Sequence, residues 1–323
     1  MRVGLVGLGR IGMVHAATLS ALADDLVVAD ADETRAEEAA KRLGARVGDP
    51  FGTDAVVITT PTSAHAGALL RACELKVPAF CEKPAAPTVA ETLRVAAAVE
   101  RSGTPVHIGF QRRFDAGFAA ARAAVRAGKL GELHRVHLLT GDPAPPPAGY
   151  VAQSGGIFRD CHIHDFDILR WVTGHEADSV HAIGANRGAA FFAEAGDVDN
   201  SAALITMDDG TLVTLQGSRY NGAGYDVRME LAGTLGTWAA GLGDRTPLRS
   251  ADGLDPGGRP WPDFQSRFEA AYAEEMRAFL AMARGEIESP CTVQDALAAL
   301  YLAEAADLSR RAGRSVRLVE VTK

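Results

Sequence analysis

The chain has 323 residues, nearly half of them apolar, and a formal net charge of −8. This length exceeds the usual size of one hydrophobic core, so we expect more than one domain. The acidic balance, without a basic run containing aromatic residues, argues against a nucleic-acid partner, and no apolar stretch approaches the ~20 residues that a membrane span needs.

The N-terminus and the cysteines are typical of a cytoplasmic protein. The chain begins directly with an apolar run and a glycine turn, without the basic segment and cleavage site of a signal peptide. Cys73, Cys81, Cys161 and Cys291 are scattered and form no C-x-x-C pair. We therefore expect reduced, mostly buried thiols rather than disulfides or a metal site.

The first thirty residues form a strand–turn–helix–strand pattern. The apolar run at 2–6 predicts a buried strand, and the alanine-rich stretch at 11–23 predicts a helix. A second apolar run, at 26–29, ends at Asp30. Between the first strand and the helix stand three glycines in G-x-G-x-x-G spacing, namely Gly7, Gly9 and Gly12.

This order of elements is the one that a dinucleotide requires. Gly7 allows the sharp turn, Gly9 lets the backbone approach a pyrophosphate, and Gly12 lets the helix lie close to the strand. The helix N-terminus supplies N–H groups and the positive end of its dipole to the phosphates. Asp30 stands where a carboxylate can accept both ribose hydroxyls of the adenosine half. The context favours dinucleotide binding over a plain glycine-rich turn.

Asp30 also favours NAD over NADP, because a carboxylate at this place repels a 2′-phosphate. Ala31 follows, so no arginine stands immediately next to Asp30 to receive that phosphate. Arg35 is close in sequence, and NADP therefore remains the less favoured alternative.

Strands and helices continue to alternate up to residue 110. Helices are expected at 33–43, 65–75 with Ser63 as N-cap, and 88–102 with a capping box from Thr88 to Glu91; strands are expected at 55–59, 77–81 and 106–110. The alternation predicts an α/β fold with a doubly wound parallel sheet. Ligands bind such sheets at the carboxyl ends of the strands. Those ends carry Asp30, Thr60, Lys83 and Gln111.

The pattern changes near Phe114, and a second domain of α+β type with an open, mostly antiparallel sheet is expected. Its strands are predicted at 133–139, 179–185, 201–207, 211–218 and 225–232, with a hairpin at 208–210 and helices at 118–128, 264–285 and 292–312. Residues 142–147 (DPAPPP) predict a rigid loop, and 251–262 a surface loop. We expect a dinucleotide-binding domain at 1–118 and a substrate-binding and oligomerisation domain at 119–323, with the C-terminal helix able to pack back on the first.

Glu82-Lys83-Pro84 follows a buried strand. A lysine at this strand end, opposite the glycine turn, points into the cofactor cleft and can stabilise a developing alkoxide. The alternative is a surface lysine in a turn, and the motif alone does not decide between the two.

Residues 154–171 (SGGIFRDCHIHDFDILRW) are rich in histidine and aspartate. The glycines at 155 and 156 precede an expected amphipathic helix, on which Asp160 and His164 share one face because they are four residues apart. His164 can take a proton near neutral pH, and Asp160 can orient its ring. A lone helical histidine is usually a core residue, but this clustering favours function.

Two further patterns leave alternatives open. The same stretch could be taken for a zinc site, but His162 and His164 face apart on a helix and the H-E-x-x-H spacing is absent, so no metal is expected. Arg113 and Asp115 stand at the predicted domain junction, where they pair with each other or contact substrate.

Several of these segments together resemble the family of glucose–fructose oxidoreductase, inositol dehydrogenase and related NAD(P)-dependent sugar dehydrogenases. The resemblance extends over almost the whole chain and is carried by GLGRIG at 7–12, TTPTSAH at 59–65, CEKP at 81–84, GFQRRFD at 109–115, 154–171, and RFEAAYAEEMRAF at 267–279. Within the family, 154–171 and the DPAPPP loop are most similar to inositol 2-dehydrogenases.

The resemblance implies a Rossmann domain, a second domain whose open sheet serves oligomerisation, and a homodimer or homotetramer. It places the family's catalytic residues on Lys83, Asp160 and His164, and a cis peptide bond at Lys83–Pro84. It also places substrate-contacting tyrosines on Tyr225 and Tyr272. One departure leaves the polyol open: Thr140-Gly141-Asp142 lacks the basic residue that the family commonly has before DPAPPP.

Taken together, these arguments predict two sets of contacts. The expected cofactor contacts are Gly7, Gly9, Arg10, Ile11, Gly12, Asp30, Thr60, Pro61, His65, Glu82, Lys83 and Gln111. The expected substrate contacts are Lys83, Arg113, Asp142, Asp160, His164, Tyr225 and Tyr272.

The predicted reaction is oxidation of a secondary ring hydroxyl of a cyclitol or sugar by NAD. His164 removes the hydroxyl proton, Lys83 stabilises the alkoxide, and Asp160 holds and tunes the pair. The alternatives are another sugar, a sugar phosphate, a nucleotide sugar or an aminocyclitol precursor as substrate, a non-catalytic NAD-sensing regulator, or a metal hydrolase. A neutral polyol is preferred because no phosphate-binding arginine cluster is evident.

Overall fold

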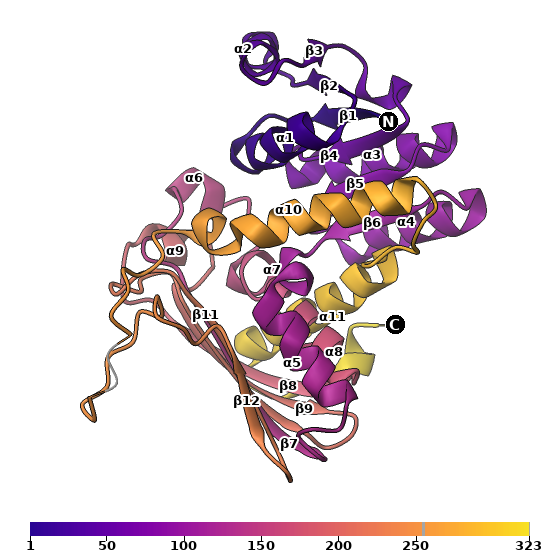
Figure 1. Cartoon of the computed structure of the whole chain (residues 1–323). Coiled ribbons are helices and arrows are strands. Elements are labelled where there is room, and N and C mark those ends of the chain that lie inside the picture. The colour runs from indigo at the N-terminus through magenta and orange to yellow at the C-terminus, as the bar shows by residue number, and fades with distance from the viewer. Residues whose placement is uncertain (254–255, 323) are drawn as a thin grey trace. The chain divides into compact units, whose positions relative to one another are not determined.

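The computed structural model describes residues 1–253 and 256–322. The chain forms two compact units (Figure 1). The first comprises Met1–Gln111 and Ala270–Ala298, and the second comprises Arg112–Glu269 and Ala299–Lys323. Among the described residues, no helix is both long enough and apolar enough to cross a bilayer.

The first unit contains a parallel sheet, as the alternation of strands and helices predicts. Its described strands have the order β3-β2-β1-β4-β5-β6, and every neighbouring pair is parallel. The strands are β1 (Arg2–Val6), β2 (Asp25–Ala29), β3 (Arg46–Val47), β4 (Ala55–Ile58), β5 (Ala79–Glu82) and β6 (Val106–Gly109). The helices between them are α1 (Arg10–Leu22), α2 (Glu33–Leu43), α3 (Thr62–Leu75) and α4 (Val89–Ser102).

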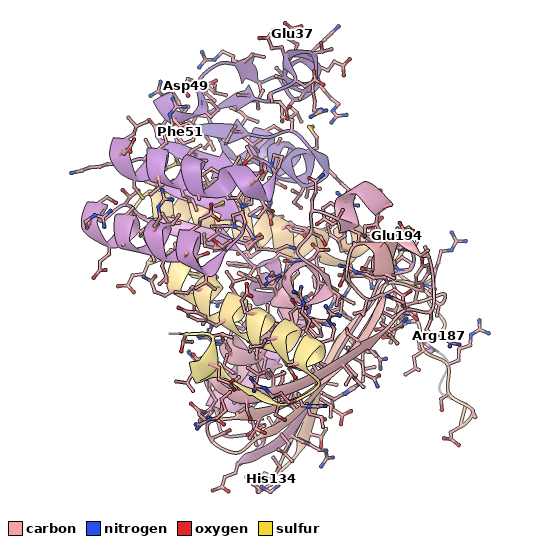
Figure 2. The ribbon with its side chains drawn as sticks, turned by 180° about the vertical axis from the view of Figure 1, so that it is seen from behind. Glu37, Asp49, Phe51, His134, Arg187 and Glu194 are labelled. Carbon is pink, nitrogen blue, oxygen red and sulfur yellow. The ribbon has the colours of Figure 1, made fainter. Side chains whose placement is uncertain are left out.

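Side-chain caps define the N-terminal ends of α2 and α4 in this unit. The Asp32 carboxylate accepts a hydrogen bond from the Arg35 N–H at the start of α2, while Glu37 projects from α2 into solvent (Figure 2). The predicted cap of Thr88 on α4 is confirmed, because its hydroxyl accepts the Glu91 N–H. The prediction of Ser63 as an N-cap was wrong. Helix α3 already begins at Thr62, without a side-chain cap.

The core of the first unit lies on the sheet and includes a distant segment of the chain. Val3, Leu5 and Phe80 of the strands belong to one buried cluster with Met276 and Phe279. These last residues lie in α10 (Phe264–Ala283), whose later part therefore belongs to this unit. Burial of the apolar face of α10 explains why a late helix joins an early sheet.

The second unit contains a seven-stranded sheet among its described residues. The strand order is β12-β11-β7-β10-β9-β8-β13, with β10 and β7 parallel and all other neighbours antiparallel. The strands are β7 (Leu133–Gly141), β8 (Ala177–Ala185), β9 (Asn200–Met207), β10 (Leu212–Ser218), β11 (Asp226–Gly233), β12 (Thr237–Ala240) and β13 (Val316–Arg317). The expected α+β domain with a mostly antiparallel sheet is confirmed, as is the β9–β10 hairpin.

Alternation along these strands makes one face buried and the other open. Val213 and Leu215 of β10 are buried, whereas Leu212, Thr214 and Gln216 are exposed. Helices cover the buried face (Figure 1). The described helices of this unit are α5 (Ala116–Arg126), α6 (Ala148–Val151), α7 (Ile157–Asp160), α8 (Ile163–Thr173), α9 (Phe191–Glu194) and part of α11 (Val293–Ala312).

The prediction that Asp160 and His164 share one face of a single helix was wrong. Helix α7 ends at Asp160, and α8 begins at Ile163, after Cys161 and His162. Asp160 and His164 therefore lie on consecutive helices rather than on one helix face. Several short elements also escaped prediction, namely β3, β12, β13, α6 and α9. Each is too short to show a periodic pattern.

Candidate active site

The glycine turn of the first unit has the geometry that its spacing predicts. Gly7 has φ +95°, and a Cβ atom there would lie 2.6 Å from the Thr59 carbonyl carbon. A Cβ on Gly12 would lie 2.0 Å from the Gly7 carbonyl oxygen, so α1 can pack this closely only with glycine. Gly9 is exposed and has open space beside it. The turn therefore offers bare backbone to a pyrophosphate at the start of α1.

Asp30 ends β2 beside this turn. Its carboxylate accepts hydrogen bonds from the Leu8 N–H (2.6 Å), the Asp32 N–H (2.9 Å) and the Arg35 guanidinium (3.0 Å). Burial acts to raise its pKa, but these backbone N–H groups and Arg35 outweigh burial, so the pKa of Asp30 is lowered. The acid is thus ionised and fixed, as a partner for ribose hydroxyls must be.

We expect Asp30→Ala to weaken NAD binding roughly ten- to hundredfold, the range for loss of hydrogen bonds to a charged group. Discrimination against NADP should fall as well, because the carboxylate no longer repels a 2′-phosphate and Arg35 loses its partner. Fluorescence titration with NADH and NADPH measures both effects. Asp25→Ala, at the other end of β2, is the matched control. An unchanged ratio of the two affinities would contradict this role for Asp30.

Lys83 directly follows β5, at one of the strand ends where the cofactor is expected to bind. The Lys83–Pro84 bond is cis, as the resemblance implies. The carboxylate of the preceding Glu82 lies 2.7 Å from His15 Nε2 and accepts the Lys83 backbone N–H at 3.3 Å. His15 is fully buried and was not among the predicted site residues. The Glu82 carboxylate thus holds the backbone at Lys83 through these two contacts. A direct contact of Glu82 with the cofactor remains a prediction.

His65 is also a support for this edge of the sheet. Its Nδ1 lies 2.7 Å from the Pro84 carbonyl oxygen and its Nε2 lies 2.8 Å from the Thr60 carbonyl oxygen. Burial lowers its pKa, although the two carbonyls act in the opposite direction. The ring is almost completely buried. It therefore ties two predicted cofactor-binding loops together, and a direct contact of His65 with the cofactor is disfavoured.

In the second unit, most of the acids and histidines around α8 form buried structural contacts. Asp165 accepts hydrogen bonds from Arg112 and Thr140, and its Oδ2 lies 2.7 Å from His162 Nδ1. His162 Nε2 lies 2.7 Å from the Ser201 hydroxyl, and a Cβ on Gly217 would collide with the ring. These buried pairs are a structural reason for the many ionisable residues in the stretch.

The two residues predicted at the domain junction pair with other partners rather than with each other. Arg113 is buried, and its Nε donates to Asp167 at 2.9 Å. Asp115 caps α5 through the Gly117 N–H (3.0 Å) and pairs with Arg267 at 2.6 Å. A buried, paired guanidinium favours the structural interpretation of Arg113 over contact with substrate.

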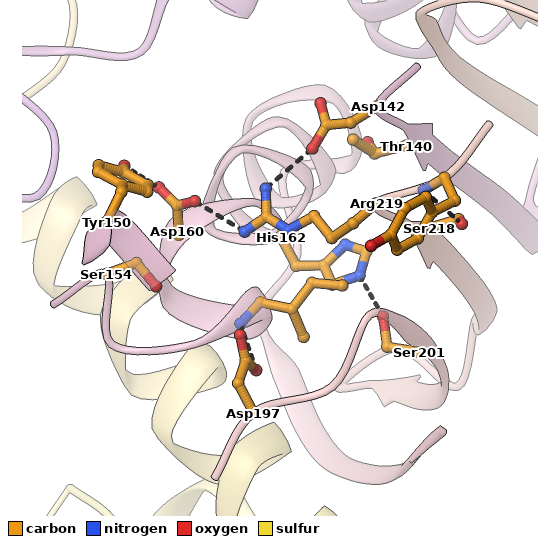
Figure 3. A network of polar contacts seen from close by, with 12 residues as sticks. Thr140, Asp142, Tyr150, Ser154, Asp160, His162, Asp197, Ser201, Ser218 and Arg219 are labelled. Carbon is orange, nitrogen blue, oxygen red and sulfur yellow. Dashed lines mark hydrogen bonds and ion pairs between the residues drawn. The ribbon is translucent and has the colours of Figure 1, made fainter. Parts of the chain in front are cut away.

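Asp160 belongs to a different network, which Figure 3 shows. Its Oδ1 accepts the Tyr150 hydroxyl at 2.7 Å, and its Oδ2 accepts Arg219 Nη2 at 2.7 Å. The other end of the same guanidinium, Nη1, donates to Asp142 at 2.9 Å. His164 is half-buried near the start of α8. The predicted residues Asp142 and Asp160 thus meet through one arginine.

Arg219 and Tyr150 were missed by sequence reasoning. Arg219 directly follows a predicted strand, and Tyr150 follows the predicted rigid loop, so each stood next to a recognised feature. Their importance depends on which strands are neighbours. Asp142 and Arg219 meet because β7 and β10 are parallel partners, and a parallel pairing inside an otherwise antiparallel sheet has no local sequence pattern.

Comparison with known proteins agrees with this architecture in both halves of the chain. Residues 1–110 match the model of an oxidoreductase family with an NAD-binding Rossmann fold, and residues 118–239 match the GFO/IDH/MocA C-terminal domain. The chain belongs to the Gfo/Idh/MocA family. It is thus a member of a family of NAD-binding oxidoreductases.

Relatives with the same fold extend over nearly the whole of this Gfo/Idh/MocA chain. Myo-inositol dehydrogenase Hyg17 of Streptomyces leeuwenhoekii is 40% identical, over 97% of this chain and 98% of the relative. Myo-inositol 2-dehydrogenase of Thermotoga maritima is 33% identical, over 99% of each chain. A crystal structure of scyllo-inositol dehydrogenase from Lactobacillus casei, with bound NAD(H) and scyllo-inositol, has a TM-score of 0.89 at 28% identity, covering 99% of each chain.

The two tyrosines predicted from the Gfo/Idh/MocA resemblance lie in different units. Tyr225 is buried in the second unit, with its ring edge-on to Phe268 at 6.4 Å. Burial raises its pKa strongly, with Arg112 acting against the rise, so its hydroxyl stays protonated. Tyr272 is buried in the first unit, with its ring 5.6 Å from that of His15. Their contact with substrate remains a prediction.

Proposed function

We propose that this chain is an NAD-dependent dehydrogenase that oxidises a secondary ring hydroxyl of a cyclitol. The observation that carries the proposal is the first unit's glycine turn with its fixed Asp30, followed along the same sheet by Lys83 beside a cis proline. The relatives named as inositol dehydrogenases support a cyclitol as the substrate class. The half-buried carboxylates of Asp142 and Asp160, joined by the buried Arg219, supply polar groups for a polyol in the second unit.

Each proposed residue has a separate task in the reaction. His164 removes the proton of the substrate hydroxyl as a general base. The Lys83 ammonium stabilises the alkoxide that develops on the oxygen. Asp160 orients and tunes these groups, and Asp30 with the glycine turn holds the adenosine half and the phosphates. Bound NAD would supply the acceptor for the hydride of the substrate carbon.

The test measures the absorbance of NADH or NADPH that forms when the chain is offered a panel of substrates. The purified chain is incubated with NAD and, in parallel, NADP, against myo-inositol, scyllo-inositol, an aminocyclitol, glucose, a sugar phosphate and a nucleotide sugar. We expect turnover with NAD and at least one neutral inositol. Turnover with only a sugar, a phosphorylated substrate or an aminocyclitol would contradict the substrate class. NADH binding without turnover on the whole panel would favour the sensing regulator.

We further propose that the open face of the second unit's sheet joins subunits into a homodimer or homotetramer. Ile183, Leu204 and Leu212 on this face are each about three-fifths exposed, and a hollow of about 540 Å³ lies over the same strands. Large apolar side chains on an open sheet face favour association. The hollow includes Leu139 and Ile183 but not Asp160, so it belongs to this surface rather than to the candidate active site.

Leu204→Glu is expected to shift the protein from oligomer to monomer, because burying an unpaired carboxylate at an interface is strongly unfavourable. Size-exclusion chromatography with light scattering measures the mass. Leu235→Glu is the matched control, because this exposed leucine lies in the β11–β12 turn outside the sheet face. A monomeric wild-type chain, or an oligomer that both variants leave intact, would contradict this interface.

A further inference from the structure

The network around Asp160 contains one guanidinium between two carboxylates. We propose that Arg219 is a positioning residue for Asp160, and that Asp142 competes with Asp160 for the charge of Arg219. This inference rests on the proposed function, in which Asp160 acts at the reacting groups. It adds to that function a device that sets both the orientation and the protonation of the acid.

Backbone hydrogen bonds hold Arg219 and Asp142 next to each other. Gly141 at the end of β7 pairs with Ser218 at the end of β10, so the next residues of both strands emerge on the same edge. The Asp142 N–H donates to the Ser218 carbonyl at 2.9 Å. The Arg219 N–H donates to the Asp199 carbonyl at 2.8 Å. The guanidinium therefore starts from a rigid position rather than from a mobile loop.

Arg219 then uses its two terminal nitrogens on different acids (Figure 3). Nη2 donates to Asp160 and Nη1 donates to Asp142, at 2.7 and 2.9 Å. The second oxygen of Asp160 is occupied by the Tyr150 hydroxyl. Because each oxygen has a donor, Arg219 and Tyr150 constrain the plane of the Asp160 carboxylate. Such fixing of a reacting group to within a small angle is a large part of enzymatic rate enhancement.

Burial of Arg219 strengthens its electrostatic interaction with the two carboxylates that share its charge. Arg219 is only 5% exposed. Burial disfavours its charge, but the negative charges of Asp160 and Asp142 outweigh burial and raise its pKa, so it remains a cation. Burial raises the pKa of Asp142, and the charge of Asp160 adds to this, while Arg219 acts against it. One buried cation thus faces two carboxylates, and each carboxylate weakens the hold of the other.

Other described ionisable groups lie around this network, and the structure gives each of them a different role. Burial raises the pKa of the Cys161 thiol, so the thiol is neutral. The Arg112 guanidinium is directed to Asp165 and Thr140. Tyr150 contributes a neutral hydroxyl to Asp160, and His164 follows at the start of α8. Arg219 is therefore the described guanidinium that donates a charged hydrogen bond directly to Asp160.

Opposite substitutions should move the pH dependence of activity in opposite directions. Arg219→Gln removes the cation, so Asp160 and the general base His164 both take up protons at higher pH, and the acid limb of the kcat/KM profile should move up by about one pH unit or more. Asp142→Asn removes the competing anion and leaves Arg219 to Asp160 alone. The acid limb should then move down, by less than one unit. A purely structural defect would not give shifts of opposite sign.

The experiment measures kcat/KM against pH with NAD and the best cyclitol of the panel, together with NADH affinity. Arg219→Gln should also lower the plateau of kcat/KM by roughly ten- to hundredfold, because Asp160 loses its fixed orientation. Arg219→Lys, which keeps a charge, should restore the position of the acid limb more than the plateau. NADH affinity should stay unchanged in all three variants. Arg170→Gln, which removes a surface pair with Glu176 in the same unit, is the matched control.

Asp160→Asn separates failure of this inference from failure of the proposed function. If Asp160→Asn is nearly inactive while Arg219→Gln and Asp142→Asn leave the acid limb in place, or move it in the same direction, the positioning role is wrong and the proposed function stands. If Asp160→Asn keeps wild-type kcat/KM, both the role of Asp160 and the role of Arg219 are overturned. Should Arg219→Gln fail to fold, the downward shift in Asp142→Asn and the partial rescue by Arg219→Lys still decide the matter.

Discussion

Lys83→Ala is expected to lower kcat by about a hundred- to ten-thousandfold, the range for loss of a positioned group at the reacting oxygen. The ammonium interacts with a charge that exists only as the alkoxide forms, so kcat and kcat/KM should fall together. NADH should still bind, because the glycine turn and Asp30 are separate from this side chain. Initial rates of NADH formation and a fluorescence titration of NADH measure the two effects.

The surroundings of Lys83 make alanine a clean replacement. Its backbone is held by the Glu82 carboxylate, and its main chain continues into the cis Pro84. These contacts do not involve the side chain that is removed. Lys41→Ala, in an exposed position on α2, is the matched control for loss of a lysine. A Lys83→Ala variant with near-wild-type kcat would remove Lys83 from the mechanism.

Asp165→Asn is expected to lower the free energy of unfolding of the second unit by about 3–5 kcal/mol, the cost of leaving a buried charge without its partner. Arg112 is buried and loses its counter-ion, and Thr140 loses a charged acceptor. Urea unfolding followed by tryptophan fluorescence reports on this unit, because Trp171, Trp238 and Trp261 all lie in it.

The same variant should change the stability of the protein in acid. Burial acts to raise the pKa of Asp165, but Arg112, His162 and Thr140 outweigh it, so the folded-state pKa is lowered. A lowered pKa contributes stability above the unfolded value of about 4, and this contribution is lost as the pH falls through the folded value. Asp165→Asn should therefore lose less stability than the wild type between pH 4 and the acid range below it.

Asp178→Asn is the control for both measurements, because Asp178 forms an exposed pair with Arg317. Loss of such a pair should cost well under about 1 kcal/mol. If Asp165→Asn costs no more than this control, the buried network does not stabilise the second unit in the way that its geometry indicates.

The local sequence was sufficient for the first unit's cofactor-binding edge. The helix expected at 33–43 coincides with α2, and the Thr88 cap is where the capping box predicts it. The roles of Gly7 and Gly12 follow from steric contacts with backbone a few residues away or one strand across. Such features depend on neighbours in sequence or on a standard strand–turn–helix unit, so spacing alone predicts them.

Spacing was a poor guide where the partner lies far along the chain. The clustering of acids at 165 and 167 favoured a functional interpretation of the stretch, but these acids pair with Arg112 and Arg113, more than fifty residues earlier. His162, at the break between α7 and α8, likewise has a distant partner in Ser201. Burial of charged pairs is a property of the packed interior, which periodicity does not describe.

By itself, the sequence determined that this chain carries a nucleotide-binding glycine turn with an acid at the next strand end, and a lysine two strands further on. Only the tertiary structure decided that Asp142, Arg219 and Asp160 form one network of ion pairs. The physical reason is that β7 and β10 are parallel neighbours. The ends of these two strands, more than seventy residues apart in sequence, therefore place the Asp142 carboxylate beside the Arg219 guanidinium. Strand pairing is set by the burial of whole sheet faces, to which the residues of the network contribute little.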